Sequence, residues 1–268
     1  MKIIPSLICV TLSSVVTLGS AYAAQWSQPK STDEKDARFS AFKDNYFLPV
    51  YHETRVNQAR FRPLNPNDDA VKDTFIQFRF SVKYRIARIE RHNLFLAYSQ
   101  TSNWEAYASS AYFRDNDYNP ELYYLLEQQD YSVALGFEHE SNGAGGDEEV
   151  SWNRLYAGLN IPFDWGYLQV TPWVRVHTGT DYNPDIKHYL GYGETELAWN
   201  ISDHQTLKAM MRNGIESGFS RGYYRLAWTF PVYQGIKGYA KAEAGYGTTI
   251  SNYNFRHNAF GLGFYFEF

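Results

Sequence analysis

The sequence predicts an all-β protein, an antiparallel transmembrane β-barrel of about 12 strands of the kind found in bacterial outer membranes. From Thr74 onwards, apolar and polar residues alternate in segments of roughly ten residues, separated by Gly, Asn, Asp or Pro turns. Aromatic residues make up 18% of the chain and concentrate at segment ends, and the non-apolar face carries Arg, Lys and Glu. A soluble β-sandwich could alternate in the same way, but these features favour a barrel with lipid outside and a polar lumen.

Residues 1–23 have the features of a secretory signal peptide. Lys2 precedes an apolar run, and Ala21 and Ala23 have the spacing that signal peptidase prefers. The only cysteine, Cys9, lies inside this run, so the mature chain is expected to contain none. Disulfides, thiol catalysis and cysteine-based zinc sites are therefore excluded.

The rest of the chain divides into a short extension and the barrel. Residues 24–43 are polar and weakly patterned, and we expect an N-terminal periplasmic extension there. Residues 44–268 are assigned to the barrel, with an even number of strands expected. No stretch after the signal approaches the roughly 20 apolar residues of a spanning helix. The net charge of −4, without a block of one sign, gives no indication of nucleic-acid binding.

Three segments show the alternation most clearly. "TFIQFRFSVKY" places apolar side chains on one face and Gln77, Arg79, Ser81 and Lys83 on the other. "GYYRLAWTF" and the C-terminal "HNAFGLGFYFEF" alternate in the same way. Each segment has two populated faces, and therefore needs two different environments.

One hairpin, expected over residues 131–160, carries polar residues where lipid-facing apolar residues are expected. In "YSVALGFEHES", His139 and Ser141 continue the face of the apolar residues before them. If the following turn pairs Ser141 with Ser151, then His139 lies opposite Asn153, and cross-strand neighbours are about 5 Å apart. The three polar side chains would then converge on one lipid-facing patch.

Such a patch is suited to nucleophilic catalysis. Ser141 would be the nucleophile, His139 the general base that takes its proton, and Asn153 the group that orients the imidazole. An asparagine orients the ring without a negative charge, which suits a membrane interface where an unpaired carboxylate is costly to desolvate. The alternative is that a histidine, a serine and an asparagine lie near a loop by chance.

These residues resemble the outer membrane phospholipase A family. "HESNG", "SWNRLY" and "NPDIKHYLGY" are similar to its signature stretches, and a looser resemblance extends from Asn45 to Phe268. The resemblance implies a twelve-stranded barrel that hydrolyses acyl ester bonds of phospholipids (phospholipase A1/A2 and lysophospholipase activity), with calcium, as a homodimer. It also implies the same roles for Ser141, His139 and Asn153.

The resemblance further implies an oxyanion hole and a calcium site. The oxyanion hole falls on the backbone N–H of Gly143. The Ca²⁺ ligands fall on the carbonyl of Ala144, the side chain of Glu149 and, from the partner chain, Ser110 or, as second choice, Ser109. Two residues depart from the family pattern, since Glu149 stands where a serine is expected and Ala144 where a charged or longer residue is expected. A carboxylate is a good ligand for a hard cation; the alternative reading of "GGDEE" is a solvated acidic turn.

Gln100 is a further polar residue on a lipid-facing stripe. In "NLFLAYSQ" it is in phase with Leu94, Leu96 and Tyr98. An amide in hydrocarbon needs a hydrogen-bond partner, which a symmetric dimer supplies. The resemblance also implies a glutamine on the dimer face. The alternative is that Gln100 lies in the headgroup layer.

We therefore expect a calcium-dependent, dimer-activated phospholipase of the bacterial outer membrane. Two other functions remain open at this point. A non-enzymatic porin would require an open lumen and would not depend on Ser141. Another barrel lipid enzyme, such as a lipopolysaccharide deacylase or acyltransferase, would share an interfacial serine and histidine but act on other substrates.

Overall fold

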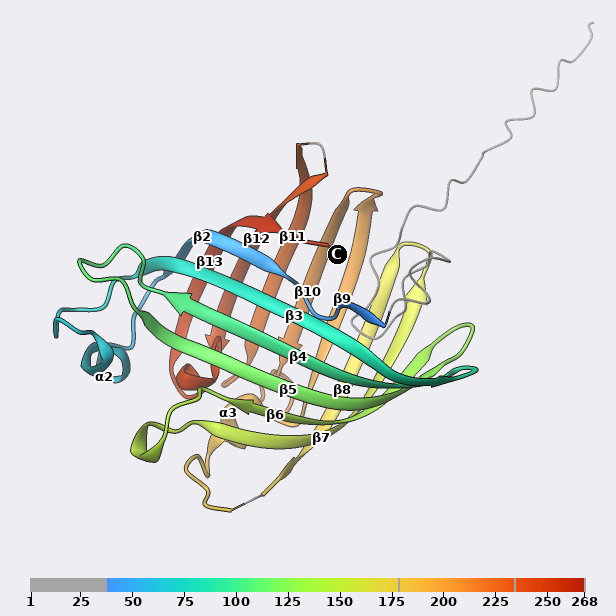
Figure 1. The fold of residues 1–268 in the computed structure, drawn as a ribbon, viewed down its shortest axis with the longest axis horizontal. Helices are drawn as coiled ribbons and strands as arrows, with labels where there is room; N and C mark the ends of the chain where they lie inside the picture. The colour runs from blue at the N-terminus through green and yellow to red at the C-terminus, as the bar shows by residue number, and fades with distance from the viewer. Residues whose placement is uncertain (1–37, 178, 234, 268) are drawn as a thin grey trace, which may run out of the picture.

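The computed structural model describes residues 38–177, 179–233 and 235–267, which form one closed antiparallel β-barrel (Figure 1). Strands β2 to β13 follow one another around the ring, and β13 closes it by pairing with β2. The predicted fold class and strand number are confirmed by this twelve-stranded ring. The signal peptide expected over residues 1–23 and most of the extension expected over 24–43 lie outside the described residues.

The strands are β1 (Phe39–Ala41), β2 (Tyr46–Glu53), β3 (Thr74–Ile89), β4 (His92–Trp104), β5 (Phe113–Glu127), β6 (Ser132–Ser141), β7 (Ser151–Phe163), β8 (Gly166–Val176), β9 (Gly193–Ser202), β10 (Gln205–Arg212), β11 (Tyr223–Tyr233), β12 (Ile236–Tyr246) and β13 (Arg256–Tyr265). Short helices lie in the connections: α2 (Gln58–Phe61), η1 (Arg62–Leu64), η2 (Gly146–Glu148), α3 (Ile186–Leu190) and η3 (Ile250–Asn252).

The barrel was expected to begin at residue 44, but its first strand lies before that residue. β1 pairs antiparallel with β3, with Phe39 opposite Tyr84. β2 pairs with another part of the same strand, with Tyr46 opposite Arg79. β1 and β2 therefore lie end to end along β3, and the last residues of the expected extension belong to the barrel body.

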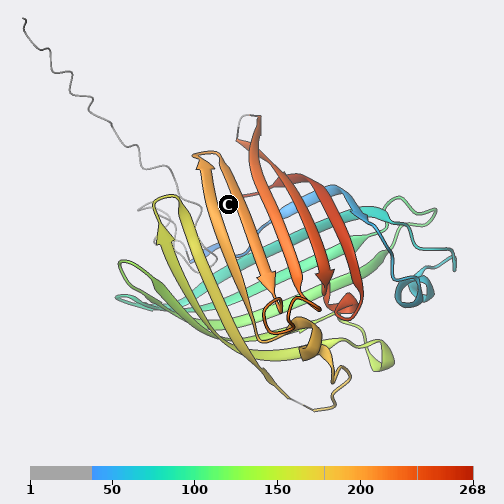
Figure 2. The same cartoon turned by 180° about the vertical axis from the view of Figure 1, so that it is seen from behind.

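Short turns and long connections occupy opposite ends of the barrel. Tight turns follow β3, β5, β7, β9 and β11, and the β3–β4 turn contains Glu90 at a φ of 53°. The connections that follow β2, β4, β6, β8, β10 and β12 are longer, and four of them contain the short helices. Figures 1 and 2 show the barrel from opposite sides, with α2 and α3 at the end of the long connections. The start of the β6–β7 connection, next to Ser141, lies at this end.

The outer surface of the ring is apolar. Alternate strand positions carry exposed side chains that include Phe80, Leu96, Leu122, Leu135, Leu155, Leu197, Leu226 and Phe260. The positions between them are buried and include Ser81, Ala97, Glu121, Glu138, Arg154 and Lys241. This arrangement confirms the predicted alternation between lipid and lumen.

No helix in the described part of the chain is both long enough and apolar enough to cross a membrane.

Charged side chains from the segment between β1 and β2 reach across the lumen. Lys43 Nζ lies 3.1 Å from the carboxylate of Glu121 on β5 and 3.3 Å from that of Glu138 on β6. The next residue, Asp44, lies 2.6 Å from Lys208 Nζ on β10. Lys43 and Asp44 each have an opposite charge beside them, because an unpaired ion inside the barrel would be costly. The adjacent residues Lys43 and Asp44 thus form ion pairs with different walls of the barrel.

Candidate active site

The β6–β7 hairpin pairs in the register predicted from its sequence. His139 lies opposite Asn153, and Ser141 lies opposite Ser151. His139, Ser141 and Asn153 are half-buried, and they share the outward face of the hairpin with the exposed side chain of Leu135. The predicted register is confirmed, and it places the three polar side chains on one face of the lipid-facing wall.

A hydrogen bond of 2.9 Å joins His139 Nδ1 to Asn153 Oδ1. An amide oxygen can only accept, so this bond requires the proton of the neutral ring to be on Nδ1. The lone pair is then on Nε2, which is free of the bond to Asn153. This tautomer is the one in which a histidine can accept a proton from a neighbouring hydroxyl.

Asn142 shapes the turn that follows Ser141. Its Oδ1 accepts hydrogen bonds from the backbone N–H groups of Ala144, at 3.2 Å, and Val150, at 3.1 Å. Its Nδ2 donates to the carbonyl of Glu148 at 2.9 Å. In the sequence, Asn142 stands out only as part of the "HESNG" motif, although an asparagine next to glycine is a known turn former. The structure identifies it as the residue that holds both ends of the turn.

Gly143, the predicted oxyanion donor, has a conformation that requires glycine. Its φ is +70°, and a Cβ atom at this position would lie 2.5 Å from Cε2 of Tyr118. The Tyr118 ring therefore packs directly on the backbone of Gly143. Tyr118 lies opposite Ser141 in the β5–β6 pairing, so the turn and the serine share one neighbour.

The β8–β9 connection holds the end of the hairpin through Asn183. The Ser151 backbone N–H donates to Asn183 Oδ1 at 2.8 Å, and Asn183 Nδ2 donates to the Glu149 carbonyl at 3.2 Å. Asp181 accepts from Arg175 at 2.6 Å and from the Asn183 backbone N–H at 3.1 Å. Burial acts to raise the pKa of the Asp181 carboxyl, but the hydrogen bonds from Arg175 and the Asn183 backbone, together with the charge of Arg175, hold that pKa below its usual value. The "NPDIKHYLGY" stretch, which begins at Asn183, thus has a structural role that the sequence did not reveal.

The predicted calcium ligands lie on two separate connections. Ala144 and Glu149 are in the β6–β7 connection, and Ser109 and Ser110 are in the β4–β5 connection. Glu149 Oε1 accepts a hydrogen bond from Ser151 Oγ at 2.7 Å, and Ser109 Oγ accepts one from a side chain of the β2–β3 connection at 2.9 Å. Within the described residues, no group of three or more His, Cys, Asp and Glu side chains could hold a metal ion. A carboxylate, a carbonyl and a hydroxyl are nevertheless oxygen donors of the kind that Ca²⁺ takes.

Gln100 has hydrogen-bond partners within its own chain. Its Oε1 accepts from the Tyr98 hydroxyl at 2.8 Å, and its Nε2 donates to Ser102 Oγ at 3.1 Å. Ser102 Oγ in turn donates to Asn116 Oδ1 at 2.7 Å. The partner predicted for this amide lies in a second chain. Within one chain, the structure shows a polar row along the outer face of β4, in which one Nε2 hydrogen of Gln100 remains for an intermolecular bond.

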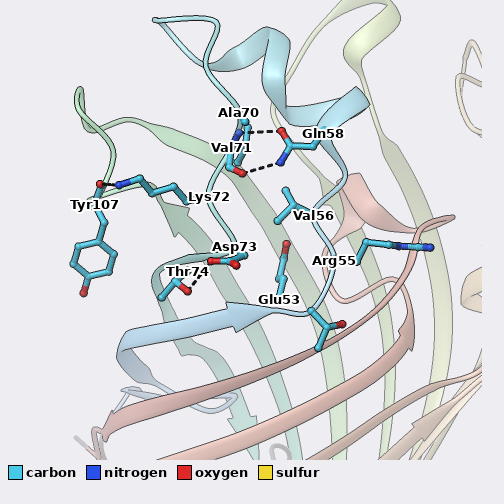
Figure 3. Close-up of a pocket in the computed structure, with 11 residues that line it drawn as sticks. Glu53, Arg55, Val56, Gln58, Ala70, Val71, Lys72, Asp73, Thr74 and Tyr107 are labelled. Atoms are coloured by element: carbon cyan, nitrogen blue, oxygen red, sulfur yellow. Dashed lines mark hydrogen bonds between the residues drawn. The ribbon is translucent and has the colours of Figure 1, made fainter.

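A pocket of about 800 Å³ lies where the β2–β3 connection leaves the barrel (Figure 3). Its lining combines Glu53 and Arg55 with Lys72, Asp73 and Tyr107. None of the residues assigned to catalysis, calcium or the dimer contact lines it. The candidate site is therefore the outward face of the hairpin, and not this pocket.

The comparisons with known proteins agree on one family. A family model described as phospholipase A1 matches residues 22–266. A putative phospholipase A1 of Neisseria meningitidis serogroup B is 31% identical over 248 residues, which cover 83% of this chain and 63% of that protein. The phospholipase A1 of Klebsiella pneumoniae is 30% identical, over 83% of this chain and 80% of that protein.

A solved structure shares the fold. The crystal structure of the Salmonella typhi outer membrane phospholipase dimer with bound calcium matches with a TM-score of 0.80 at 24% identity, over 93% of this chain and 98% of that chain. The barrel described above thus has the same architecture as that outer membrane protein.

Proposed function

Because the chain belongs to the phospholipase A1 family, we propose that it hydrolyses acyl ester bonds of phospholipids at the outer leaflet of a bacterial outer membrane. The observation that carries this proposal is the 2.9 Å bond between His139 Nδ1 and Asn153 Oδ1, on the same outward face as Ser141. A nucleophile on the lipid-facing wall can reach an ester at the membrane interface without extracting the lipid into water.

The reaction proceeds by acyl transfer through Ser141. Its Oγ attacks the ester carbonyl while His139 Nε2 takes the hydroxyl proton, and the Gly143 N–H stabilises the tetrahedral oxyanion. The C–O bond of the ester breaks, and the leaving lysophospholipid takes the proton from His139. A water molecule, deprotonated by His139, then attacks the acyl-Ser141 ester and releases a fatty acid. Asn153 holds the imidazole of His139 in place during both the acylation and the deacylation of Ser141.

The residues of the β6–β7 connection suit a calcium ion. The Ala144 carbonyl and the Glu149 carboxylate would hold it, together with the Ser110 hydroxyl, or that of Ser109, from a second chain. When bound, the ion would supply positive charge beside the developing oxyanion. Because its ligands come from two chains, activity would require a homodimer, with Gln100 at the contact.

The lumen supports an enzyme in preference to a porin. Lys43 and Asp44 cross the lumen and form ion pairs with different walls, on β5 and β6 in one direction and on β10 in the other. A water-filled channel through the middle of the barrel would have to pass these side chains. We therefore retain the lipid hydrolase as the proposed function.

Fatty acid release from phospholipid–detergent micelles, with calcium or with a chelator, tests the proposal. We expect calcium-dependent release by the wild type and a loss of at least about 10³-fold in Ser141→Ala, with a milder loss in Asn153→Ala, which keeps nucleophile and base. A Ser141→Ala protein that is folded, as shown by heat modifiability, yet works within about tenfold of wild type would remove Ser141 from its role. Release from lipopolysaccharide but not from phospholipid would assign the protein to the lipopolysaccharide deacylases.

A further inference from the structure

We propose that Lys43 and Asn119 are positioning residues, which fix the catalytic His139 from the lumen side of the barrel. This inference rests on the proposed function, because it concerns the same serine and histidine. Neither residue reaches the outer face, where the substrate would bind. Asn119 contacts the backbone of β6 behind the catalytic patch, and Lys43 acts through Asn119.

The β5–β6 ladder is interrupted beside His139. The two strands pair in one register on both sides of Pro120, which places this proline opposite His139. Proline has no N–H, so Pro120 cannot donate a backbone hydrogen bond to the His139 carbonyl. The side chain of Asn119 does so instead, with Nδ2 at 2.8 Å from the His139 carbonyl oxygen. A side chain has thus taken the place of a backbone donor at the catalytic residue.

Lys43 determines which way the Asn119 amide faces. Its Nζ donates to Asn119 Oδ1 at 2.9 Å. An ammonium group can only donate, so the oxygen of the amide must face Lys43. The NH₂ end is then directed at the His139 carbonyl. Without Lys43, the amide would lose the partner that holds its oxygen away from that carbonyl.

An ion-pair cluster holds Lys43 behind the hairpin. Lys43 Nζ is within 3.3 Å of Glu138, which precedes His139 in the chain, and Glu138 lies 2.8 Å from Arg154, which follows Asn153. Glu138 and Arg154 are also opposite one another in the β6–β7 register. The outward-facing pair of His139 and Asn153 is therefore next to an inward-facing ion pair, Glu138 and Arg154, one residue away on each strand. Lys43 joins this ion pair to the gap in the β5–β6 ladder.

The barrel offers a matched control for Lys43. Lys208 is a second lumen lysine, with a side chain 11% exposed against 16% for Lys43, and it pairs with Asp44 at 2.6 Å. It lies on β10, away from the hairpin. Lys43→Met and Lys208→Met each remove one lumen cation that takes part in the ion pairs of the segment between β1 and β2. Only Lys43→Met removes the hydrogen bond to Asn119. Asn119→Asp is a second test, because it keeps the shape and the partner of Lys43 but loses the donor to His139.

The measurements are kcat and KM for micellar phospholipid, and the rate at which an alkyl sulfonyl fluoride modifies Ser141. We expect Lys43→Met and Asn119→Asp to lower kcat and the sulfonylation rate about tenfold, with KM within about twofold of wild type, since small misplacements of a catalytic group act on the rate. Lys208→Met should keep both rates within about twofold, and Lys43→Arg, which can still donate to Asn119, should recover most of the loss.

Two results would overturn the inference: equal losses in Lys43→Met and Lys208→Met, in step with lower unfolding temperatures, or a wild-type kcat in Asn119→Asp. A wild type that reacts with the sulfonyl fluoride but releases no fatty acid would overturn the proposed substrate. The sulfonylation rates of the variants would still decide the positioning role in that case.

Discussion

Glu149 is the residue at which this chain departs most clearly from the family pattern it resembles, because a carboxylate replaces an expected hydroxyl. Its Oε1 is held by the Ser151 hydroxyl at 2.7 Å, and its backbone carbonyl by Asn183 at 3.2 Å. The side chain is therefore oriented within the connection that follows Ser141. An oriented carboxylate is a stronger ligand for a hard cation than a neutral hydroxyl.

We predict that Glu149→Ala raises the calcium concentration for half-maximal activity by about tenfold or more, because the site loses a full charge. The rate at saturating calcium should change comparatively little, since the triad is untouched. Glu148→Ala is the control: Glu148 is an exposed neighbour that pairs with Arg60 at 2.7 Å. Calcium titrations of fatty acid release distinguish the two variants. An unchanged titration curve in Glu149→Ala would place the cation elsewhere.

Contacts between the two strands of one hairpin were accessible from the sequence, and contacts between distant segments were not. The bond between His139 and Asn153 follows from hairpin pairing, which one turn determines. Asn119 could not be recognised, because its role depends on Lys43, 76 positions earlier in the chain. The partners of Gln100 were missed for another reason. They lie two residues away on the same strand, and only the side-chain conformations reveal them.

At the scale of single elements, the β6–β7 turn is the part of the site with the tightest conformational requirement. Gly143 has a φ of +70° and packs under the Tyr118 ring, whereas Gly145 has a φ of −120° and open space where a Cβ atom would lie. The two glycines are close in the chain but differ in what a methyl group would meet. They form a natural pair of test positions.

We predict that Gly143→Ala lowers kcat by about tenfold or more, because the turn must shift and moves the N–H that faces the oxyanion. Gly145→Ala should stay within about twofold of wild type. Rates of fatty acid release at saturating calcium and lipid provide the comparison. If both alanine variants were equally active, the Gly143 conformation would have no part in transition-state stabilisation.

Strands could be predicted individually, because the apolar and polar residues of each strand alternate between the lipid and the lumen. The alternation that begins at Thr74 is visible as strands with exposed apolar and buried polar side chains. β1 escaped prediction, because it has only three residues and pairs with the far end of β3. Its neighbour Lys43 looked like part of a periplasmic extension, since the sequence does not show that its acidic partners lie on β5 and β6.

At the scale of the whole molecule, the barrel separates a charged interior from an apolar exterior, and the proposed catalytic patch interrupts the exterior. The polar row of Tyr98, Gln100, Ser102 and Asn116 on β4 and β5 is a second interruption. Tyr118, which lies opposite both Gln100 and Ser141, connects the two. A second chain that covered this row would therefore lie close to the catalytic hairpin. This proximity supports a site completed by the Ser110 or Ser109 hydroxyl of that chain.

We predict that activity depends on protein density in the membrane or micelle. Diluting the protein into excess detergent should lower specific activity, and calcium with substrate should oppose the loss, because ligands that bind only the dimer favour it. Gln100→Ala should move the dilution curve to higher protein density by up to about tenfold, equivalent to about 1.4 kcal/mol. The shift of the dilution curve is limited, because Tyr98 and Ser102 already form hydrogen bonds with the Gln100 amide.

Leu197→Ala is the control for this experiment, because Leu197 also faces outward but lies on β9, away from the polar row. Its dilution curve should coincide with that of the wild type. Sedimentation of the same samples measures the fraction of dimer, which should fall in step with specific activity. Specific activity that stays flat across a thousandfold dilution, roughly 4 kcal/mol of association free energy, in samples that sediment only as monomers, would rule out activation by dimerisation. The Ser141 chemistry would then operate within a single barrel, and Ser109 and Ser110 would have no role as ligands from a second chain.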